Sequence, residues 1–157
     1  TIDQLEQARE MIEREVARAA AVNATANDVE ALRSSLNGIL EAEDTLAGRE
    51  ADYQFHLCLI YASHNPVLFL VVEGLAIGWR RVLRHRYHLV QKVEGAVDRI
   101  NATHSEILAA VEGGDADGAM LAMDKHFRTW NEEYRKLTTL FSSREQGSDA
   151  SSTRVDG

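Results

Sequence analysis

Residues 97–111 read VDRINATHSEILAAV and give the clearest indication of the fold class. Apolar side chains recur every three or four residues, which is the period of an α-helix. The stripe that they form is Val97, Ile100, Ile107 and Val111. His104 interrupts this stripe at a position where a leucine is expected. The stretch therefore predicts an amphipathic helix with one polar group on its buried face.

The same period continues along the chain and predicts six helices and no strands. Their approximate ranges are 2–21, 28–42, 49–63, 66–90, 93–112 and 116–141. Thr25 and Asp28 fit a capping box before the second helix, and Gly48 is expected to mark a turn. Asn65 is a typical N-cap, with Pro66 at the first helical position. We therefore expect an all-α fold, an antiparallel bundle of about six helices with short links.

Length and composition fit one domain of ordinary size. The chain has 157 residues, of which 45% are hydrophobic, with only one proline and ten glycines. Residues 1–141 are expected to form this domain. Residues 142–157 are rich in Ser, Asp and Gly, so we expect a disordered tail there. The chain begins inside an amphipathic pattern, which suggests that residue 1 is a cut point in a longer protein.

Charge and cysteine content exclude several functions for this chain alone. A formal net charge of -8 repels a phosphate backbone, so direct binding of nucleic acid is not expected. Cys58 is the only cysteine, so no internal disulfide can form, which favours a reducing, cytoplasmic location. No apolar run is long enough to span a membrane, and no membrane partner is expected.

Ionisable side chains interrupt the apolar stripes on three of the predicted helices. His104 stands on the fifth helix and His126 on the sixth, while Asp52 and His56 are one turn apart on the third. A single buried histidine is usually an ordinary core residue with a hydrogen-bond partner. Three helices that each turn such a group inward are better explained by a shared ion. One carboxylate and three imidazoles suit zinc, our first candidate, or nickel, manganese or iron.

Several segments resemble the FCD domain, the effector half of FadR-like regulators in the GntR family. Residues 52–56 are similar to its D-x-x-F-H signature, and 104–110 to its H-x-x-I-L-x-A segment. The other similar positions are Arg9–Glu13, Ala17–Ala21, Thr25, Asn65, Asp115, Ala119 and His126. Together they extend over about residues 3–137, and their order and spacing are more specific than any one of them.

The resemblance implies a sensor of a small organic or sugar acid. In metal-binding FCD domains, the positions of Asp52, His56, His104 and His126 hold the ion. The resemblance also implies a homodimer and a winged helix-turn-helix that binds operator DNA. We find no such module in this chain, so operator DNA would be bound only through an absent N-terminal domain. Effector binding, not catalysis, is the expected function.

Five further residues are candidates for contacting a carboxylate effector. Arg9 lies on the apolar side of the first helix and would face the effector cavity. The arginine-rich run 79–88 is mostly expected to face solvent, with Arg80 or Arg84 reaching the cavity. Trp130 lies one turn beyond His126. Asn101 and Asn131 are candidates for supporting the ligands or contacting the effector. The candidate effector-binding residues are therefore Arg9, Arg80, Asn101, Trp130 and Asn131.

Two other interpretations of the metal-type cluster remain open at this point. A metal-dependent hydrolase or oxygenase uses similar ligands, but it also needs a general base. Glu13, Glu73 and Glu106 are candidates for that base only by their place in the pattern. Alternatively, a purely structural metal could hold a bundle that serves only for dimerisation. A closed site with no adjoining cavity would favour this last interpretation.

Overall fold

The computed structural model describes residues 1–149 of the chain. Within these residues it contains six α-helices and no strands, which confirms the predicted all-α class. The helices are α1 (Ile2–Asn23), α2 (Ala26–Leu40), α3 (Thr45–Ala62), α4 (Pro66–Val90), α5 (Ala96–Glu112) and α6 (Ala116–Asp149). No helix in the described part of the chain is long and apolar enough to cross a membrane.

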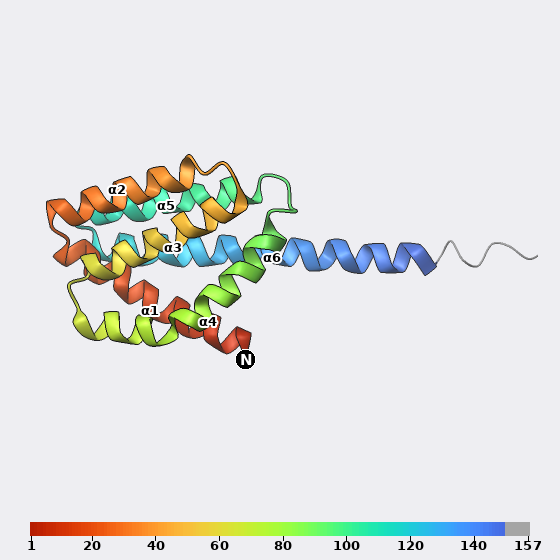
Figure 1. Cartoon of the computed structure of the whole chain (residues 1–157), viewed down its shortest axis with the longest axis horizontal. Coiled ribbons are helices and arrows are strands. Elements are labelled where there is room, and N and C mark those ends of the chain that lie inside the picture. The colour runs from red at the N-terminus through yellow and green to blue at the C-terminus, as the bar shows by residue number, and fades with distance from the viewer. Residues whose placement is uncertain (150–157) are drawn as a thin grey trace, which may run out of the picture.

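Consecutive helices run back and forth and form an antiparallel bundle (Figure 1). The closest packing is between α5 and α6, between α2 and α3, and of α1 against α6 and α3. Helix α4 crosses the bundle obliquely over α1 and α3. At its crossing with α1, a Cβ atom on Gly78 would lie 2.9 Å from Cδ2 of Leu5, so the glycine allows this close approach.

Most helix starts follow the signals in the sequence. Thr25 and Asp28 form the predicted capping box of α2, and Asn65 caps α4 with Pro66 at its first position. Gly48 was expected in a turn, but it lies inside α3, which begins at Thr45 after the N-cap Asp44. The reason is packing, since the hydroxyl of Tyr87 occupies the space where a Cβ of residue 48 would be.

The last helix is longer than the sequence suggested. We expected α6 to end near Phe141 and a disordered tail from 142, but the helix continues to Asp149. Ser, Asp and Gly disfavour helix only weakly per residue, so composition was a poor guide to this boundary. The remainder of the predicted tail, 150–157, lies outside the described residues.

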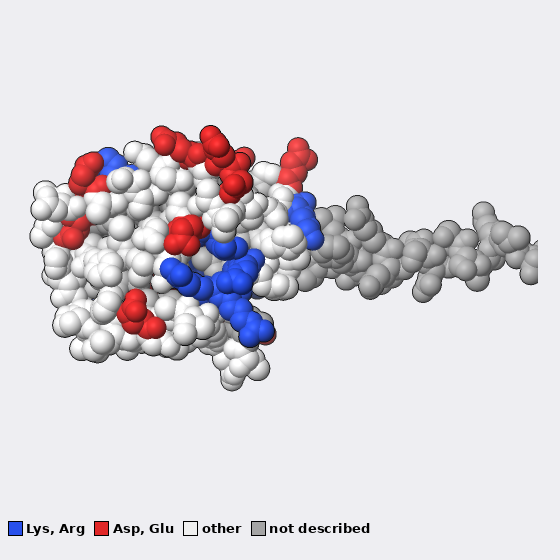
Figure 2. Space-filling view, viewed as in Figure 1, with Lys and Arg blue, Asp and Glu red and all other residues white. Residues whose placement is uncertain are grey.

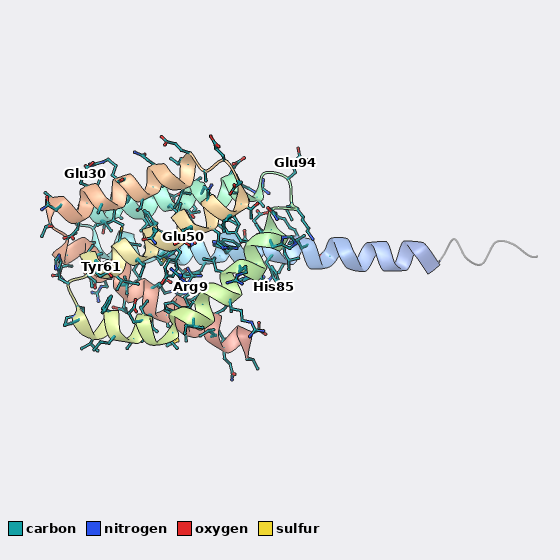
Figure 3. All side chains as sticks on the ribbon, viewed as in Figure 1. Arg9, Glu30, Glu50, Tyr61, His85 and Glu94 are labelled. Carbon is teal, nitrogen blue, oxygen red and sulfur yellow. The ribbon has the colours of Figure 1, made fainter. Side chains whose placement is uncertain are left out.

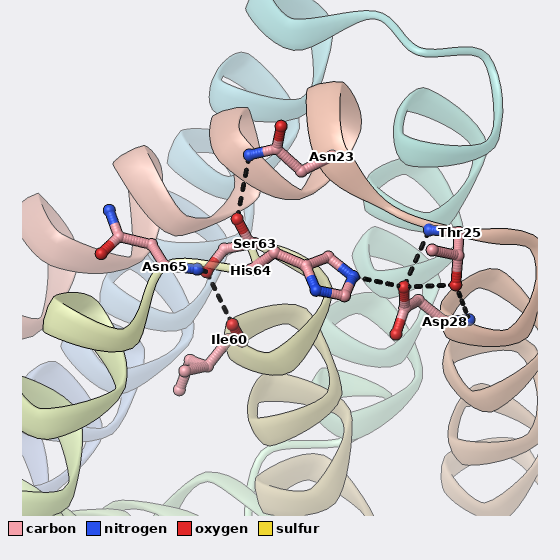
Figure 4. Close-up of polar contacts among 7 residues, drawn as sticks. All are labelled: Asn23, Thr25, Asp28, Ile60, Ser63, His64 and Asn65. Carbon is pink, nitrogen blue, oxygen red and sulfur yellow. Dashed lines mark hydrogen bonds and ion pairs between the residues drawn. The ribbon is translucent and has the colours of Figure 1, made fainter.

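The junction between α3 and α4 is fixed by polar contacts to the α1–α2 turn (Figure 4). His64 has a positive φ of 50°, and its Nε2 lies 2.8 Å from a carboxylate oxygen of Asp28. The side-chain amide of Asn23 donates to the carbonyl of Ser63 at 2.9 Å, and the Ser63 hydroxyl donates to the carbonyl of Ile60. These bonds hold the ends of four helices together at one end of the bundle.

Two apolar clusters form the core, and a polar layer lies between them. On α5, Ile107 belongs to the larger cluster and Ile100 to the smaller one. On α6, Met123 and Trp130 are divided between the clusters in the same way. His104 lies between Ile100 and Ile107 along α5, and His126 lies between Met123 and Trp130 along α6. The core therefore encloses a small set of buried ionisable groups.

Candidate metal centre

Four side chains of the metal-ligating type meet in the polar layer. Asp52 and His56 come from α3, His104 from α5 and His126 from α6. Each is buried, with at most 5% of its surface exposed. One ligand-type atom from each residue lies within 4.8 Å of the corresponding atoms of the other three. The sequence-predicted set of four is thus brought together completely.

The ring of His126 is oriented by a threonine on the neighbouring helix. The hydroxyl of Thr103 donates to the carbonyl of Ile100 at 2.6 Å, so its oxygen is left to accept. Nδ1 of His126 lies 2.8 Å from that oxygen and is assigned as the donor. Burial, with His104 and His56 nearby, lowers the pKa of His126 well below its usual value. The ring is therefore neutral, with the lone pair of Nε2 available for a ligand bond.

The ring nitrogen Nδ1 of His56 contacts a buried ion pair on α1. This nitrogen contacts Oε2 of Glu13, and Oε1 of Glu13 accepts from Nε of Arg9 at 2.6 Å. Burial alone would raise the pKa of Glu13, but the charges of Arg9 and His56 outweigh it and lower the pKa to about 2. A carboxylate behind a histidine is the usual support of a metal-binding imidazole. Nε2 of His56 is then the ring atom left for the cluster.

Asp52 brings the negative charge of the cluster. Its Oδ1 lies 3.1 Å from Nε2 of His104, and its Oδ2 lies 4.0 Å from Nε2 of His56. Burial acts to raise the pKa of Asp52, but contact with His104 and the positive charges around it lower the pKa overall. Phe55 packs edge-on against His104, with ring centroids 5.0 Å apart. Asp52 is therefore an ionised carboxylate inside an apolar shell.

The buried ligand atoms lack hydrogen-bond partners, and this tests whether a metal fits. Within the described structure, no hydrogen bond of good geometry reaches either oxygen of Asp52 or Nε2 of His56, His104 or His126, although Oδ1 of Asp52 lies 3.1 Å from Nε2 of His104. Several such atoms without partners in one place would cost several kcal/mol, roughly 1–3 for each group. A divalent cation would satisfy all four residues at once, and three imidazoles with one carboxylate suit zinc or a similar transition metal. The residues therefore fit the metal that the sequence predicted.

A small cavity adjoins the cluster between α1, α3 and α4. It is lined by Arg9, Glu13, Tyr53, His56, Leu57, Ile60, Val72, Trp79 and Leu83. Its volume is about 10 Å³, which is room for no more than one water molecule. Figure 3 shows Arg9 on α1 close to where α4 crosses the bundle. Of the four ligand-type residues only His56 lines this cavity, so the cavity meets the cluster at one residue and is nearly closed.

The other predicted effector residues occupy different places around the bundle. Trp130 is buried and shares a second small cavity with Arg9. Arg80 is exposed on α4, and its guanidinium lies 4.1 Å from the ring centroid of Tyr53. Asn101 lines a groove near the α2–α3 link, and Asn131 lines one near the start of α1. Neither groove is lined by any of the four ligand-type residues, so an effector role for these two asparagines stays a prediction.

Sequence reasoning missed the contacts of three residues in the interior of the bundle. Glu13 was considered only as a possible base, although its place four residues after Arg9 on one helix face was a usable signal. Thr103 carried no signal, because its role depends on where α6 lies. Arg86 was grouped with the solvated arginines, but it reaches inward to contact Glu6 and donates to Asn131 at 2.6 Å.

Comparison with known proteins gives a consistent family. The FCD domain model matches residues 4–129. The putative L-lactate dehydrogenase operon regulatory protein of Escherichia coli (strain K12) is 32% identical over 120 residues, 76% of this chain and 46% of that protein. The HTH-type transcriptional regulator LutR of Bacillus subtilis (strain 168) is 34% identical over 129 residues, 77% of this chain and 58% of LutR.

A third relative is the galactonate operon transcriptional repressor of Escherichia coli (strain K12), 35% identical over 119 residues. The match covers 75% of this chain and 51% of the repressor, so the chain spans about half the length of the curated relatives it matches. These names agree with the expectation of a regulatory family and not an enzymatic one. With a family model that matches most of its length, the chain belongs to the FCD domain family of GntR-type regulators.

Proposed function

We propose that this chain is the effector-sensing domain of a transcription regulator. It binds a divalent metal, with zinc as the first candidate, through Asp52, His56, His104 and His126. A small organic or sugar acid binds beside the metal and modulates DNA binding by another part of the regulator. The observation that supports this most strongly is the convergence of four buried ligand groups without hydrogen-bond partners.

The charges around the cluster favour an anionic effector. A divalent ion with Asp52 as its only anionic ligand keeps a net positive charge and supplies open coordination positions to a carboxylate. Arg9 adds a guanidinium on the same side, and its own partner Glu13 also contacts His56. A carboxylate that entered the small cavity would meet Arg9, whose planar fork suits bidentate pairing.

The nearly closed cavity supports a sensor, because binding would require a change in packing. A cavity of about 10 Å³ cannot hold lactate or a sugar acid, so α4 would have to move relative to α1 and α3. An acid that binds only the opened arrangement shifts the population toward it. We propose that the regulator is a homodimer, in which this shift alters the spacing of two DNA-binding modules.

The test is a set of thermal melts of the metal-loaded domain with and without chelator. L-Lactate and D-galactonate serve as acids, suggested by the names of the relatives, and 1,2-propanediol and galactitol serve as uncharged matches. We expect at least one acid to raise the melting temperature, because a ligand that binds only the folded state stabilises it. The matched neutral compound should have no effect.

Chelation should abolish the response to the acid, because the carboxylate then loses its partner ion. A wider panel of sugar acids and short dicarboxylates extends the test in the same format. If no acid shifts the melting temperature of a domain that demonstrably holds metal, the effector part of the proposal is wrong. If the purified domain holds no transition metal and takes up none, the metal part is wrong.

A further inference from the structure

A hollow lined by arginines lies on the surface outside the metal centre. Its walls are Arg49, Glu50 and Tyr53 on α3 and Arg80, Leu83 and Arg84 on α4. Figure 2 shows basic side chains gathered around a depression on this face, with an acidic side chain at its border. The hollow has a volume of about 70 Å³. Within the described structure, Arg49 and Arg84 form no ion pair, so their charges are not neutralised by a direct partner.

The arginine hollow and the inner cavity share two walls. Tyr53 and Leu83 line the hollow, and the same two residues line the cavity that contains Arg9 and His56. Tyr53 follows Asp52 in α3, and Leu83 lies opposite on α4. Tyr53 and Leu83 therefore border both the outer space and the cavity beside the metal-type cluster.

The ring of Tyr53 is covered on its outer face by Arg80. The guanidinium of Arg80 stacks over this ring at 4.1 Å, and Arg80 lies 3.8 Å from the carboxylate of Glu50. A cation over an aromatic ring at an exposed site is weakly held, so thermal motion can break this contact. Through these contacts, Arg80 links α4 to Tyr53 and Glu50 of α3 at the point where the hollow meets the cavity.

We propose that the arginine hollow is an outer anion-binding site and the entrance to the inner cavity, and that Tyr53 closes it while Arg80 is stacked on the ring. Small carboxylates are attracted by Arg49, Arg80 and Arg84. When a carboxylate draws Arg80 away from the Tyr53 ring, the path to Arg9 and His56 opens. This inference rests on the proposed function for the identity of its ligand, but the existence of a closed entrance does not depend on it.

The test uses collisional quenching of the fluorescence of Trp79, which lines the inner cavity and is 4% exposed. The chain has two tryptophans, so Trp130→Phe in every protein leaves Trp79 as the single emitter. Acrylamide reports access by a neutral molecule, and iodide reports access by an anion. Tyr53→Ala should raise the quenching constants of both, by roughly twofold or more, since local opening controls access to buried groups.

Four further variants complete the design. Tyr53→Phe keeps the ring and should leave quenching unchanged, and Tyr61→Ala removes an exposed tyrosine of the same helix as a control. Arg80→Met, an exposed substitution that should not disturb folding, should also raise acrylamide quenching. Arg49→Ala with Arg84→Ala should lower iodide quenching roughly twofold and leave acrylamide quenching unchanged, because basic side chains concentrate anions nearby.

The outcomes separate this inference from the proposed function. Quenching is measured without metal or acid, so a domain that binds no acid can still show the closed entrance. Folded Tyr53→Ala and Arg80→Met proteins with unchanged acrylamide quenching would overturn the closure. Equal iodide quenching with and without Arg49 and Arg84 would overturn the outer anion site.

Discussion

The hydroxyl oxygen of Thr103 accepts a hydrogen bond from Nδ1 of His126 at 2.8 Å, and this bond selects the ring atom that faces the cluster. Because the Thr103 hydroxyl itself donates to the backbone of α5, it cannot also donate to the imidazole. The proton of His126 is therefore placed on Nδ1, and Nε2 is left without a hydrogen. Thr103, which precedes His104 on α5, thus orients the imidazole of His126 on α6.

Thr103→Val should weaken metal binding without removing a ligand. Valine has the same shape, but it leaves the Nδ1–H of His126 buried without an acceptor. Loss of such a supporting contact reduces metal affinity about 10-fold to 100-fold. Competition with a chromophoric chelator measures the change. Thr103→Ser keeps the acceptor and should bind nearly as the parent does, while Thr129→Val removes a threonine on the exposed side of α6. Equal affinities for Val and Ser at position 103 would contradict the orienting role.

His126→Ala should abolish retention of metal through purification. The substitution removes one of three imidazoles, and the three remaining ligands hold a divalent ion more weakly. Metal content by inductively coupled plasma mass spectrometry, with circular dichroism as a check of folding, measures this directly. His88→Ala changes an exposed histidine of α4 and should retain the parent content. Full metal content in a folded His126→Ala protein would remove this residue from the ligand set.

The sequence was a good guide to which ionisable side chains meet in the core, because these residues interrupt stripes that are otherwise apolar. His104 and His126 each stand between apolar neighbours one turn away on either side, and periodicity alone places them inward. Asp52 and His56 are four residues apart, so the helical period also places them on one face of α3. Side chains that act across helices were harder to predict. Thr103 and Arg86 have roles that depend on the packing of α6 and α4, and no local pattern in the sequence encodes that packing.

Helix boundaries were likewise easier to predict where they depend on nearby residues than where they depend on packing against another helix. The caps of α2 and α4 were predicted correctly because capping is a local interaction between residues that are near in sequence. Gly48 was misinterpreted as a turn because its small size serves a contact with Tyr87, which lies on a different helix. The end of α6 was also missed, since composition alone favoured an earlier stop.

Glu13 should make the stability of the domain depend on pH in the acidic range. Its folded-state pKa of about 2 lies below the usual value of 4.5, so its contribution is complete above about pH 4.5 and is lost as the pH falls toward 2. Urea unfolding at pH 6 and pH 3 measures this for the parent and for Glu13→Gln. The variant should be less stable at pH 6 because Arg9 loses its buried partner.

The difference in free energy of unfolding between the parent and Glu13→Gln should narrow at pH 3, because Glu13 is then mostly protonated in the unfolded parent and folding has to release that proton. A shift of this direction at a buried carboxylate corresponds to about 3 kcal/mol at most, by the usual conversion of pKa to free energy. Glu15→Gln alters a neighbouring glutamate that is exposed and should show no such narrowing. A gap that stays constant between the two pH values would show that Glu13 does not titrate in this range.

The ion pair between Glu6 and Arg86 should couple α1 to α4 energetically. Both side chains are largely buried, at 11% and 12% exposure, and Arg86 also donates to Asn131 on α6. Glu6→Gln or Arg86→Met alone leaves a buried charge without its partner, which typically costs about 3 kcal/mol. The double variant removes both charges, so its destabilisation should be smaller than the sum of the two single values.

Chemical denaturation of the four proteins in this cycle gives the coupling between the two side chains. Arg84→Met is the matched control, because Arg84 is exposed on the same helix and its replacement should change stability little. Strict additivity of the two substitutions would mean that the pair does not hold α4 onto α1. A positive coupling would identify Glu6 and Arg86 as a contact that resists movement of α4, the movement that the proposed binding of an acid at Arg9 requires.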